Sequence, residues 1–251
     1  MRILELFSGT GSVGKVAREM GHRVVSLDIS NKYKPDICMD ILDFDYKQWP
    51  SGSFDLVWAS PPCQLYSIAP AQLFTAEQRA ARAEAGNAVT HRTREIIDWL
   101  KPRYYVVENP NSSLIWKQGI FDDWPDKKVS YCKYGYKYRK LTRLKTNVDF
   151  QPKICKWDCG AVRQIRDAHG KLHFHHEEVA KQGVSAHCKG LGVQCTTHKR
   201  DELWTIPGQL VRDILIAAGG GEQGEIGVQD SPRGPAEQRP ASPPEPPRLA
   251  S

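Results

Sequence analysis

The sequence predicts an α/β fold built on a mostly parallel sheet, and three stretches of the chain indicate it. Residues 2–28 read as a strand, a glycine-rich turn, a helix and a second strand that closes on an acid. A short apolar strand at 54–58 runs into a Pro-Pro-Cys turn at 61–63, and another at 104–107 runs into Glu-Asn-Pro at 108–110. Because parallel α/β sheets place their chemistry at the carboxyl ends of the strands, we expect these residues to form one site.

The turn after the first strand carries glycines at positions 9, 11 and 14, and apolar residues between 13 and 20 continue it as a helix. Glycines let the backbone approach a ligand closely, and the amino end of a helix offers unpaired N–H groups. Asp28 ends the strand at 22–27, where its carboxylate is placed to accept hydrogen bonds from a ribose diol. The turn therefore predicts a nucleotide-like cofactor, although a tight turn without a ligand has the same pattern.

A second acid helps to define that cofactor. Asp40 and Ile41 follow a short strand at 36–39 and are suited to hold the edge of an adenine ring. The glycine-rich turn taken alone fits a nicotinamide cofactor as well as S-adenosylmethionine.

Two reactive side chains follow the other strands. Two prolines stop the strand before Cys63 and fix a rigid turn, which presents one thiol at the carboxyl end of a strand. Glu108 stands at the end of a buried strand and is followed two residues later by proline. A small buried cysteine and a turn-capping glutamate are the purely structural alternatives.

Basic residues gather in two places. A helix predicted at 76–100 carries four arginines in its polar part, and residues 127–147 hold eight Lys/Arg and four tyrosines without an acid. The alternation in the second segment predicts a β-hairpin around Gly135. Interleaved bases and aromatic rings can bind phosphates and stack on nucleobases, whereas a solvated basic face is the alternative for both segments.

Residues 150–200 are rich in cysteine and histidine. The spacings Cys155-x3-Cys159 and Cys195-x2-His198 suit zinc, but the two pairs are far apart and histidines are in surplus. Structural zinc and free thiols, including Cys188, both remain open, and the sequence assigns no metal ligand.

The composition excludes several classes of protein. No apolar run approaches the length of a membrane span, and no signal peptide precedes the first strand. Without a signal peptide, we expect a reducing compartment of the cell, and seven cysteines, an odd number, fit free thiols or a metal better than a disulfide framework. The net charge is +6 for the whole chain and +8 for residues 1–218, which favours a polyanionic partner.

The end of the chain divides into a helix and a tail. A final helix is predicted at about 209–218, and residues 219–251 are a proline-rich stretch expected to be disordered. We therefore expect a cofactor-binding catalytic domain at 1–150 and a small Cys/His-rich insert at 151–200. The closing helix of the catalytic domain lies within 201–218, and the tail follows it.

Three motifs together carry a family resemblance. The segment Leu6-Phe7-Ser8-Gly9-Thr10-Gly11 resembles the cofactor motif of the DNA (cytosine-5)-methyltransferases. The Ser-Pro-Pro-Cys segment at 60–63 is similar to their catalytic proline-cysteine motif, and 108–110 is similar to their Glu-Asn-Val motif. The resemblance covers residues 1 to about 150 and the closing helix near 206–207, in the order that the family shows. It implies a Rossmann-like class I S-adenosylmethionine-dependent methyltransferase fold with a mostly parallel, seven-stranded sheet.

The resemblance also implies roles for individual residues. Cys63 would be the nucleophile that adds to cytosine, Glu108 the acid that assists it, and Arg143 the cation that stabilises the oxygen on carbon 2 of the ring. The segment 139–143 lies in the region of a paired-arginine motif of the family but lacks its glutamine and its spacing. The cofactor site would be lined by Phe7, Gly9, Gly11, Asp28, Asp40 and Ile41.

One departure from the family concerns size. Typical members carry a large domain that reads the target sequence, whereas only the insert at 151–200 is available here. The chain therefore looks like the compact members of phages and large viruses, with DNA as the expected partner and a target cytosine turned out of the duplex. An inactive module that binds S-adenosylmethionine and nucleic acid, or a methyltransferase of RNA cytosine, are the alternatives. A dehydrogenase would not explain Cys63 and Glu108.

Overall fold

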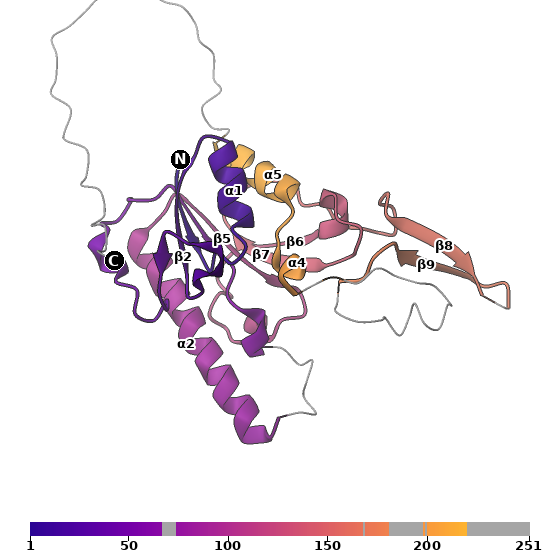
Figure 1. The fold of residues 1–251 in the computed structure, drawn as a ribbon, viewed down its shortest axis with the longest axis horizontal. Helices are drawn as coiled ribbons and strands as arrows, with labels where there is room; N and C mark the ends of the chain where they lie inside the picture. The colour runs from indigo at the N-terminus through magenta and orange to yellow at the C-terminus, as the bar shows by residue number, and fades with distance from the viewer. Residues whose placement is uncertain (67–73, 168, 181–197, 199, 220–251) are drawn as a thin grey trace, which may run out of the picture. The chain divides into compact units, whose positions relative to one another are not determined.

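The computed structural model describes residues 1–66, 74–167, 169–180, 198 and 200–219 (Figure 1). The proline-rich tail after Gly219, the thiols of Cys188 and Cys195, and the middle of the loop that follows Cys63 lie outside these residues. The predictions made for the tail therefore stay predictions.

A twisted sheet forms the centre of the described part of the chain, where seven strands lie in the order β3-β2-β1-β4-β5-β7-β6. Strands β1 to β5 are parallel, and β7 runs antiparallel to both of its neighbours. This sheet confirms the predicted α/β class and the mostly parallel, seven-stranded arrangement. The strands are β1 (Arg2–Leu6), β2 (Arg23–Asp28), β3 (Ile37–Cys38), β4 (Leu56–Ala59), β5 (Tyr104–Pro110), β6 (Asp126–Ser130) and β7 (Leu141–Thr146).

The strand order reverses between β1 and β4. The chain moves from β1 outward to β2 and β3, then returns to the other side of β1 for β4 and β5. A parallel sheet opens a crevice at such a switch point, beyond the carboxyl ends of the two strands. The glycine-rich turn follows β1 and the Cys63 turn follows β4, so the topology brings these two segments together.

Helices cover both faces of the sheet (Figure 1). Helices α1 (Ser12–Glu19) and α5 (Gly208–Gly219) pack against each other on one face, and α2 (Ala76–Leu100) covers the other. Successive residues of a strand point to opposite faces, so in β4 Val57 joins the core under α2 while Trp58 joins the core under α1. Both side chains are fully buried, which explains why this strand reads as a continuous apolar run.

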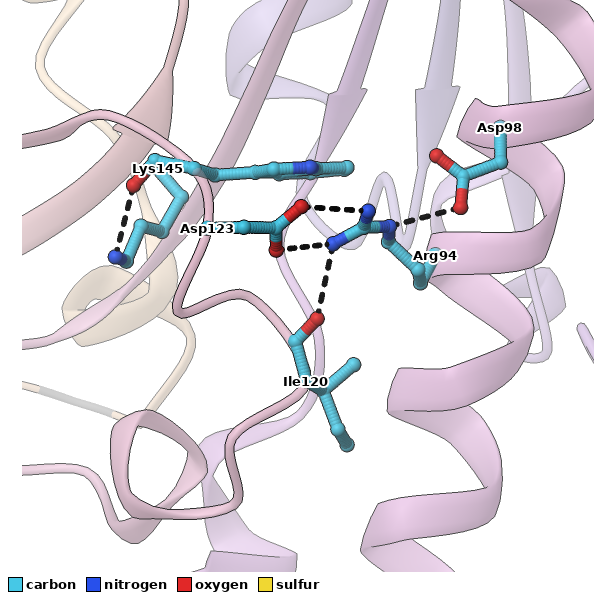
Figure 2. Close-up of polar contacts among 6 residues, drawn as sticks. Arg94, Asp98, Ile120, Asp123 and Lys145 are labelled. Carbon is cyan, nitrogen blue, oxygen red and sulfur yellow. Dashed lines mark hydrogen bonds and ion pairs between the residues drawn. The ribbon is translucent and has the colours of Figure 1, made fainter.

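Arginines of α2 hold the helix in place. Figure 2 shows the Arg94 guanidinium between two carboxylates, donating to both oxygens of Asp123 at 2.7 and 2.9 Å and to Asp98 at 2.8 Å. The same group donates to the Ile120 carbonyl at 3.1 Å and stacks on the Trp124 ring. Bidentate pairs of this kind fix geometry as well as charge. Arg94 therefore joins α2 to the loop before β6 while 24% of its side chain stays exposed, and the predicted contribution of the α2 arginines to phosphate binding stays a prediction.

The basic segment forms the predicted antiparallel pair, β6 with β7, and Gly135 turns the chain with φ of 97°. Its tyrosines, however, are part of the core. Tyr131, Tyr134 and Tyr138 are between 0% and 4% exposed, so they cannot stack on nucleobases. The predicted aromatic contribution to nucleic-acid binding is therefore wrong for these three residues, because they fill the layer under α5 and the closing segment.

Smaller elements complete the described chain. A two-stranded hairpin, β8 (Val162–Arg166) and β9 (Leu172–His176), lies within the predicted insert, and helix α4 (Arg200–Trp204) precedes α5. Short 3-10 turns connect the rest, at Asn31–Tyr33, Tyr46–Gln48, Cys63–Tyr66, Leu114–Lys117 and Tyr131–Tyr134. Within the described residues, no helix combines the length and the apolar character that a membrane span requires.

Candidate active site

A cavity of about 470 Å³ opens at the switch point of the sheet. It is lined by most of the residues that the sequence predicts for the site, from both the cofactor and the catalytic groups. Gly11 and Arg143 do not line it. The predicted residues that do are Phe7, Gly9, Asp28, Asp40, Ile41, Cys63 and Glu108.

The glycine-rich turn is held open by left-handed backbone and by one carboxylate. Phe7, Gly9 and Gly11 have φ of 60°, 47° and 68°, a region that suits glycine and is rare for phenylalanine. Asp28 accepts hydrogen bonds from the Gly9 N–H and the Ser30 N–H, each at 2.8 Å. A carboxylate offers about four acceptor positions, so Asp28 can brace the turn and still accept from a ligand. Gly11 acts on the shape of the turn as the N-cap of α1.

Glu5 lies behind the turn and is not among the residues that the sequence predicts for the site. A Cβ on Gly14 would stand 2.4 Å from its Oε2, which explains the third glycine of the motif. Burial raises the pKa of Glu5 to about 7, although Arg18 and the backbone N–H groups of Gly14 and Val13 oppose the shift. The carboxyl therefore changes charge near neutral pH at the start of α1.

Asp40 and Ile41 line the same cavity as the glycine-rich turn. The Asp40 carboxylate accepts a hydrogen bond from the Leu42 N–H at 2.9 Å, and Ile41 is 3% exposed within the core under α2. The Met39 N–H donates to the Asp28 carbonyl at 3.0 Å, which ties this segment to β2. The two acids that the sequence places in the cofactor site therefore lie on adjoining backbone.

The Cys63 turn is bonded to the end of β5. The Asn109 side chain donates to the Pro61 carbonyl at 2.7 Å, and it is 1% exposed. Because β4 and β5 are parallel neighbours, this one hydrogen bond fixes the turn that carries Cys63 against the strand that carries Glu108. The asparagine in the Glu-Asn-Pro motif is thus a positioning residue for the thiol.

Helix α2 supports the other side of the same turn. The Tyr66 hydroxyl makes hydrogen bonds with Asn87 at 2.8 Å and with Thr90 at 2.9 Å. Its ring lies against Gly86, where an added Cβ would stand 2.8 Å from the ring. Arg82 also donates to the Gln64 carbonyl at 2.7 Å. These contacts with α2 fix the position of the short turn Cys63–Tyr66.

The environment of Cys63 favours the neutral thiol over the thiolate. Burial raises the pKa of Cys63, the Lys140 ammonium opposes this rise, and the Glu108 carboxylate adds to it. Lys140 lines the cavity and donates to the Leu203 carbonyl at 3.0 Å. It is not among the residues that the sequence predicts for the site, because its position in a basic segment gives no local signal.

Glu108 is buried and has a phenol as its partner. The Tyr131 hydroxyl donates to Glu108 Oε1 at 2.9 Å, and both side chains are buried. Burial and the nearby carboxylate raise the pKa of Tyr131 well above its usual value, so the phenol stays protonated and remains a donor. Tyr131 thereby fixes the direction of the Glu108 carboxylate.

Arg143, the predicted third catalytic residue, lies apart from the cavity. The backbone of Arg143 in β7 lies opposite Asn109 in β5. Its guanidinium, however, approaches Asp126 at 3.5 Å and stacks on the Trp116 ring. Lys140, three residues earlier, is the cation of this segment that lines the cavity. The structure therefore does not bring Arg143 to Cys63 and Glu108.

The closing segment before α5 lines the cavity next to the turn after β2. Tyr33 donates to Asp201 at 2.6 Å, and Lys32 forms an ion pair with the same carboxylate. Trp204 lines the cavity with Lys32 and Tyr33, and 42% of its surface remains exposed. The sequence does not predict these side chains for the site, because segments separated by about 170 residues meet only in the fold.

The chain is similar in sequence to known DNA methylases. A family model described as C-5 cytosine-specific DNA methylase matches residues 1–136. A Frog virus 3 (isolate Goorha) protein, named "Probable DNA (cytosine-5)-methyltransferase", is 37% identical over an alignment of 165 residues, and the match covers 62% of this chain and 75% of that protein.

Solved structures show weaker likenesses. A methyltransferase from Entamoeba histolytica is 18% identical, with a TM-score of 0.46 over 62% of this chain and 57% of that one. The Dnmt2 methyltransferase of S. pombe is 16% identical, with a TM-score of 0.41 over 61% of this chain and 53% of that one. The matched part thus spans little more than half of each solved chain. By its matching family model and its viral relative, the chain belongs to the C-5 cytosine-specific DNA methylase family.

Proposed function

We propose that this chain transfers the methyl group of S-adenosylmethionine to carbon 5 of cytosine in DNA, through a transient covalent bond to Cys63. One observation carries the proposal. Cys63 and Glu108 stand at the ends of adjacent strands in one cavity, joined by the Asn109 bond, and the glycine-rich turn with Asp28 lines the same cavity. Membership of the C-5 cytosine-specific DNA methylase family supports the same reaction.

The described residues fit S-adenosylmethionine. Gly9 presents backbone without a side chain at the cavity, Asp28 keeps acceptor capacity for ribose hydroxyls, and Asp40 with Ile41 offers a polar edge beside an apolar surface. The sulfonium group of the cofactor supplies an electrophilic methyl group.

The chain itself makes the cytosine reactive. Carbon 5 of cytosine is a poor nucleophile, and a thiolate that bonds to carbon 6 turns the ring into an enamine that can take up the methyl group. Cysteine suits this role because its thiolate is strongly nucleophilic and leaves readily. The proton on carbon 5 is then lost to solvent as the bond between carbon 6 and sulfur breaks, which returns the thiolate. Lys140 would stabilise that thiolate.

Glu108 would act on the opposite edge of the ring. In our proposal its carboxyl engages ring nitrogen 3 and the exocyclic amine, where charge changes as sulfur adds to carbon 6. Tyr131 holds the carboxyl in one direction through the bond of 2.9 Å, so the group does not need to reorganise during the step. Arg143, which lies outside the cavity, has no place in this step.

The substrate would be a base turned out of the duplex. A cytosine inside the stack cannot reach a half-buried thiol, and extrusion costs about a few kcal/mol. The basic residues of 1–218 can offset this cost through contacts with phosphates.

Methyl transfer measures the proposal directly. The full chain is incubated with labelled S-adenosylmethionine and either DNA or RNA, and the product is digested to nucleosides. We expect 5-methylcytosine from DNA, its loss with Cys63→Ser, and wild-type yield with Cys38→Ser, because Cys38 is an exposed thiol on β3. Methylation of RNA but not of DNA would show that the substrate is RNA and contradict the proposed one. Binding of cofactor and DNA without transfer would show an inactive module.

A further inference from the structure

Four side chains that suit a soft metal ion converge outside the cavity. Cys132, Cys155, Cys159 and His176 each offer one ligand atom, and these atoms all lie within 4.8 Å of one another. The distance from Cys155 Sγ to His176 Nε2 is 3.6 Å. The three cysteines are free thiols, so no disulfide explains their proximity.

The four residues come from separate parts of the chain. Cys132 lies in the turn between β6 and β7 of the main sheet, Cys155 and Cys159 lie in the loop before β8, and His176 ends β9. Cys132, Cys155 and His176 are between 2% and 7% exposed. Three thiols and one imidazole that meet in a largely buried place form a ligand set of the kind that structural zinc sites use.

The spacing agrees with tetrahedral coordination. Zinc bonds of about 2.3 Å to sulfur and about 2.0 Å to nitrogen set neighbouring ligand atoms about 3.5–3.8 Å apart. The spacing of at most 4.8 Å between the four ligand atoms needs only small side-chain rotations to reach that geometry. Thiolate and imidazole ligands select zinc over hard cations such as Mg²⁺. We propose that Cys132, Cys155, Cys159 and His176 bind one structural zinc ion.

The loop between two of the ligands is shaped for this role. Trp157 adopts a left-handed backbone with φ of 68°, a conformation that a bulky residue rarely takes. The chain thereby folds back, and the N–H groups of Trp157 and Asp158 point at the Cys155 sulfur. Hydrogen bonds of this kind orient a metal ligand from its outer side. The Cys155 N–H is itself bonded to the Ser130 hydroxyl at 3.1 Å, which ties the loop to β6.

The surrounding charge also suits a metal thiolate centre. Three thiolates and one Zn²⁺ leave a single negative charge. Lys133 interacts electrostatically with Cys155 and Cys159 and forms an ion pair with Asp158 at 2.9 Å. Arg139 stacks over the Trp157 ring, which lies 5.3 Å from the His176 ring. Two cations therefore lie close enough to the four side chains to interact with them electrostatically.

A zinc ion would supply stability that this region lacks. An isolated two-stranded hairpin is at most marginally stable, and the large apolar side chains here, Leu172, Phe174 and Trp157, are between 37% and 44% exposed. Metal coordination is a common substitute for a hydrophobic core in so small a unit. Through Cys132, the ion would fasten the hairpin β8–β9 to the catalytic sheet.

This ligand set differs from the pairs that the sequence suggests. Cys155 and Cys159 form one half of the centre, but Cys132 and His176 form the other half in place of Cys195 and His198. His198 contacts the carboxylates of Glu178 and Glu202 instead. Cys195 lies outside the described residues.

Metal analysis of the full chain is the first test. Protein is expressed without added metal, purified without chelator and measured by plasma mass spectrometry. We expect about one zinc per chain. Exchange of zinc for Co²⁺ should give visible absorption of a tetrahedral ion and a thiolate charge-transfer band whose intensity corresponds to three thiolates. Protein without bound metal, or a band that corresponds to two or four thiolates, would overturn the assignment.

Substitutions locate the site and do not depend on methyl transfer. Cys132→Ser and His176→Gln should each lower bound zinc severalfold, whereas Cys38→Ser should leave it unchanged because Cys38 is exposed on β3, outside the cluster. Cys195→Ser should also leave it unchanged. Loss of zinc in Cys195→Ser together with full retention in Cys132→Ser would overturn the ligand set. If Cys132→Ser fails to fold, the thiolate count of the wild-type Co²⁺ spectrum still decides.

Discussion

At the scale of single residues, the thiol of Cys63 depends on a cation that lies far from it in sequence. Burial raises the pKa of Cys63 and Lys140 opposes the rise. Without this ammonium the pKa should rise further, and the thiolate fraction near neutral pH should fall.

We therefore expect Lys140→Met to move the alkylation of Cys63 by iodoacetamide to higher pH and to lower kcat by about tenfold. Lys140→Arg should restore part of the alkylation at lower pH and part of kcat, since it keeps the positive charge. Lys15→Met, at an exposed position of α1, serves as the control. An alkylation profile of Lys140→Met that superimposes on the wild-type profile would remove Lys140 from the mechanism.

Glu5 gives the fold a predicted dependence on pH. Its pKa is about 7 in the folded chain, against an ordinary value of 4.5, because burial disfavours the charged form. The folded state therefore holds a proton that the unfolded state releases between these values. Stability from this group is complete below about pH 4.5 and declines by up to about 3 kcal/mol as pH rises through 7.

Glu5→Gln should flatten this dependence, because the amide does not titrate. Urea unfolding at pH 5 and pH 8 gives the change in unfolding free energy between these pH values for wild type and for Glu5→Gln. The other titrating groups contribute equally to both proteins, so the difference between the two changes belongs to Glu5. Equal declines in the two proteins would show that Glu5 ionises normally in the fold.

At the scale of elements, helix α2 sets the position of the catalytic turn. Gly86→Ala should favour the helix by up to about 1 kcal/mol through propensity. The new methyl group would nevertheless meet the Tyr66 ring at 2.8 Å and displace the turn that begins at Cys63. Because small displacements of reacting groups are costly, we expect kcat to fall by about tenfold to a hundredfold with little loss of melting temperature.

The adjacent Ala85→Gly is the matched control, since Ala85 is exposed on the same helix. It should lower stability by about 1 kcal/mol and leave kcat unchanged. Wild-type kcat in Gly86→Ala would show that Tyr66 does not transmit the position of α2 to the thiol.

Individual elements also show what local sequence can predict. The strand-turn-helix unit at the start is visible because periodicity and glycines are local features, and the structure confirms it as β1, α1 and β2. The tyrosines of 127–147 are predicted to be accessible to nucleobases because they alternate with lysines, a pattern typical of an exposed surface. Tertiary packing, which the local sequence does not reveal, buries three of them. The ion pair of Arg94 on α2 could not be predicted locally either, since Arg94 meets Asp123 only in the fold.

At the scale of the whole molecule, the topology explains the site. Glycine-rich turn, thiol and carboxylate were predicted together because parallel strands present their carboxyl ends at one edge. The bonds that fix them were not predictable, since Asn109 to Pro61 spans 48 residues and Tyr131 to Glu108 spans 23. The same limit applies to the Cys/His cluster, because Cys132, in the turn between β6 and β7, meets the three other side chains only in the fold.

The covalent bond to Cys63 is tested most directly with DNA that contains 5-fluorocytosine. Fluorine replaces the hydrogen that must leave carbon 5, so a chain that has transferred its methyl group cannot release the base. With S-adenosylmethionine we expect a denaturation-resistant adduct of wild type, mapped to Cys63 by peptide mass spectrometry. Cys63→Ser should form none, and Cys38→Ser should form as much as wild type. Methylation without any trapped adduct, or an adduct on another cysteine, would contradict covalent catalysis by Cys63.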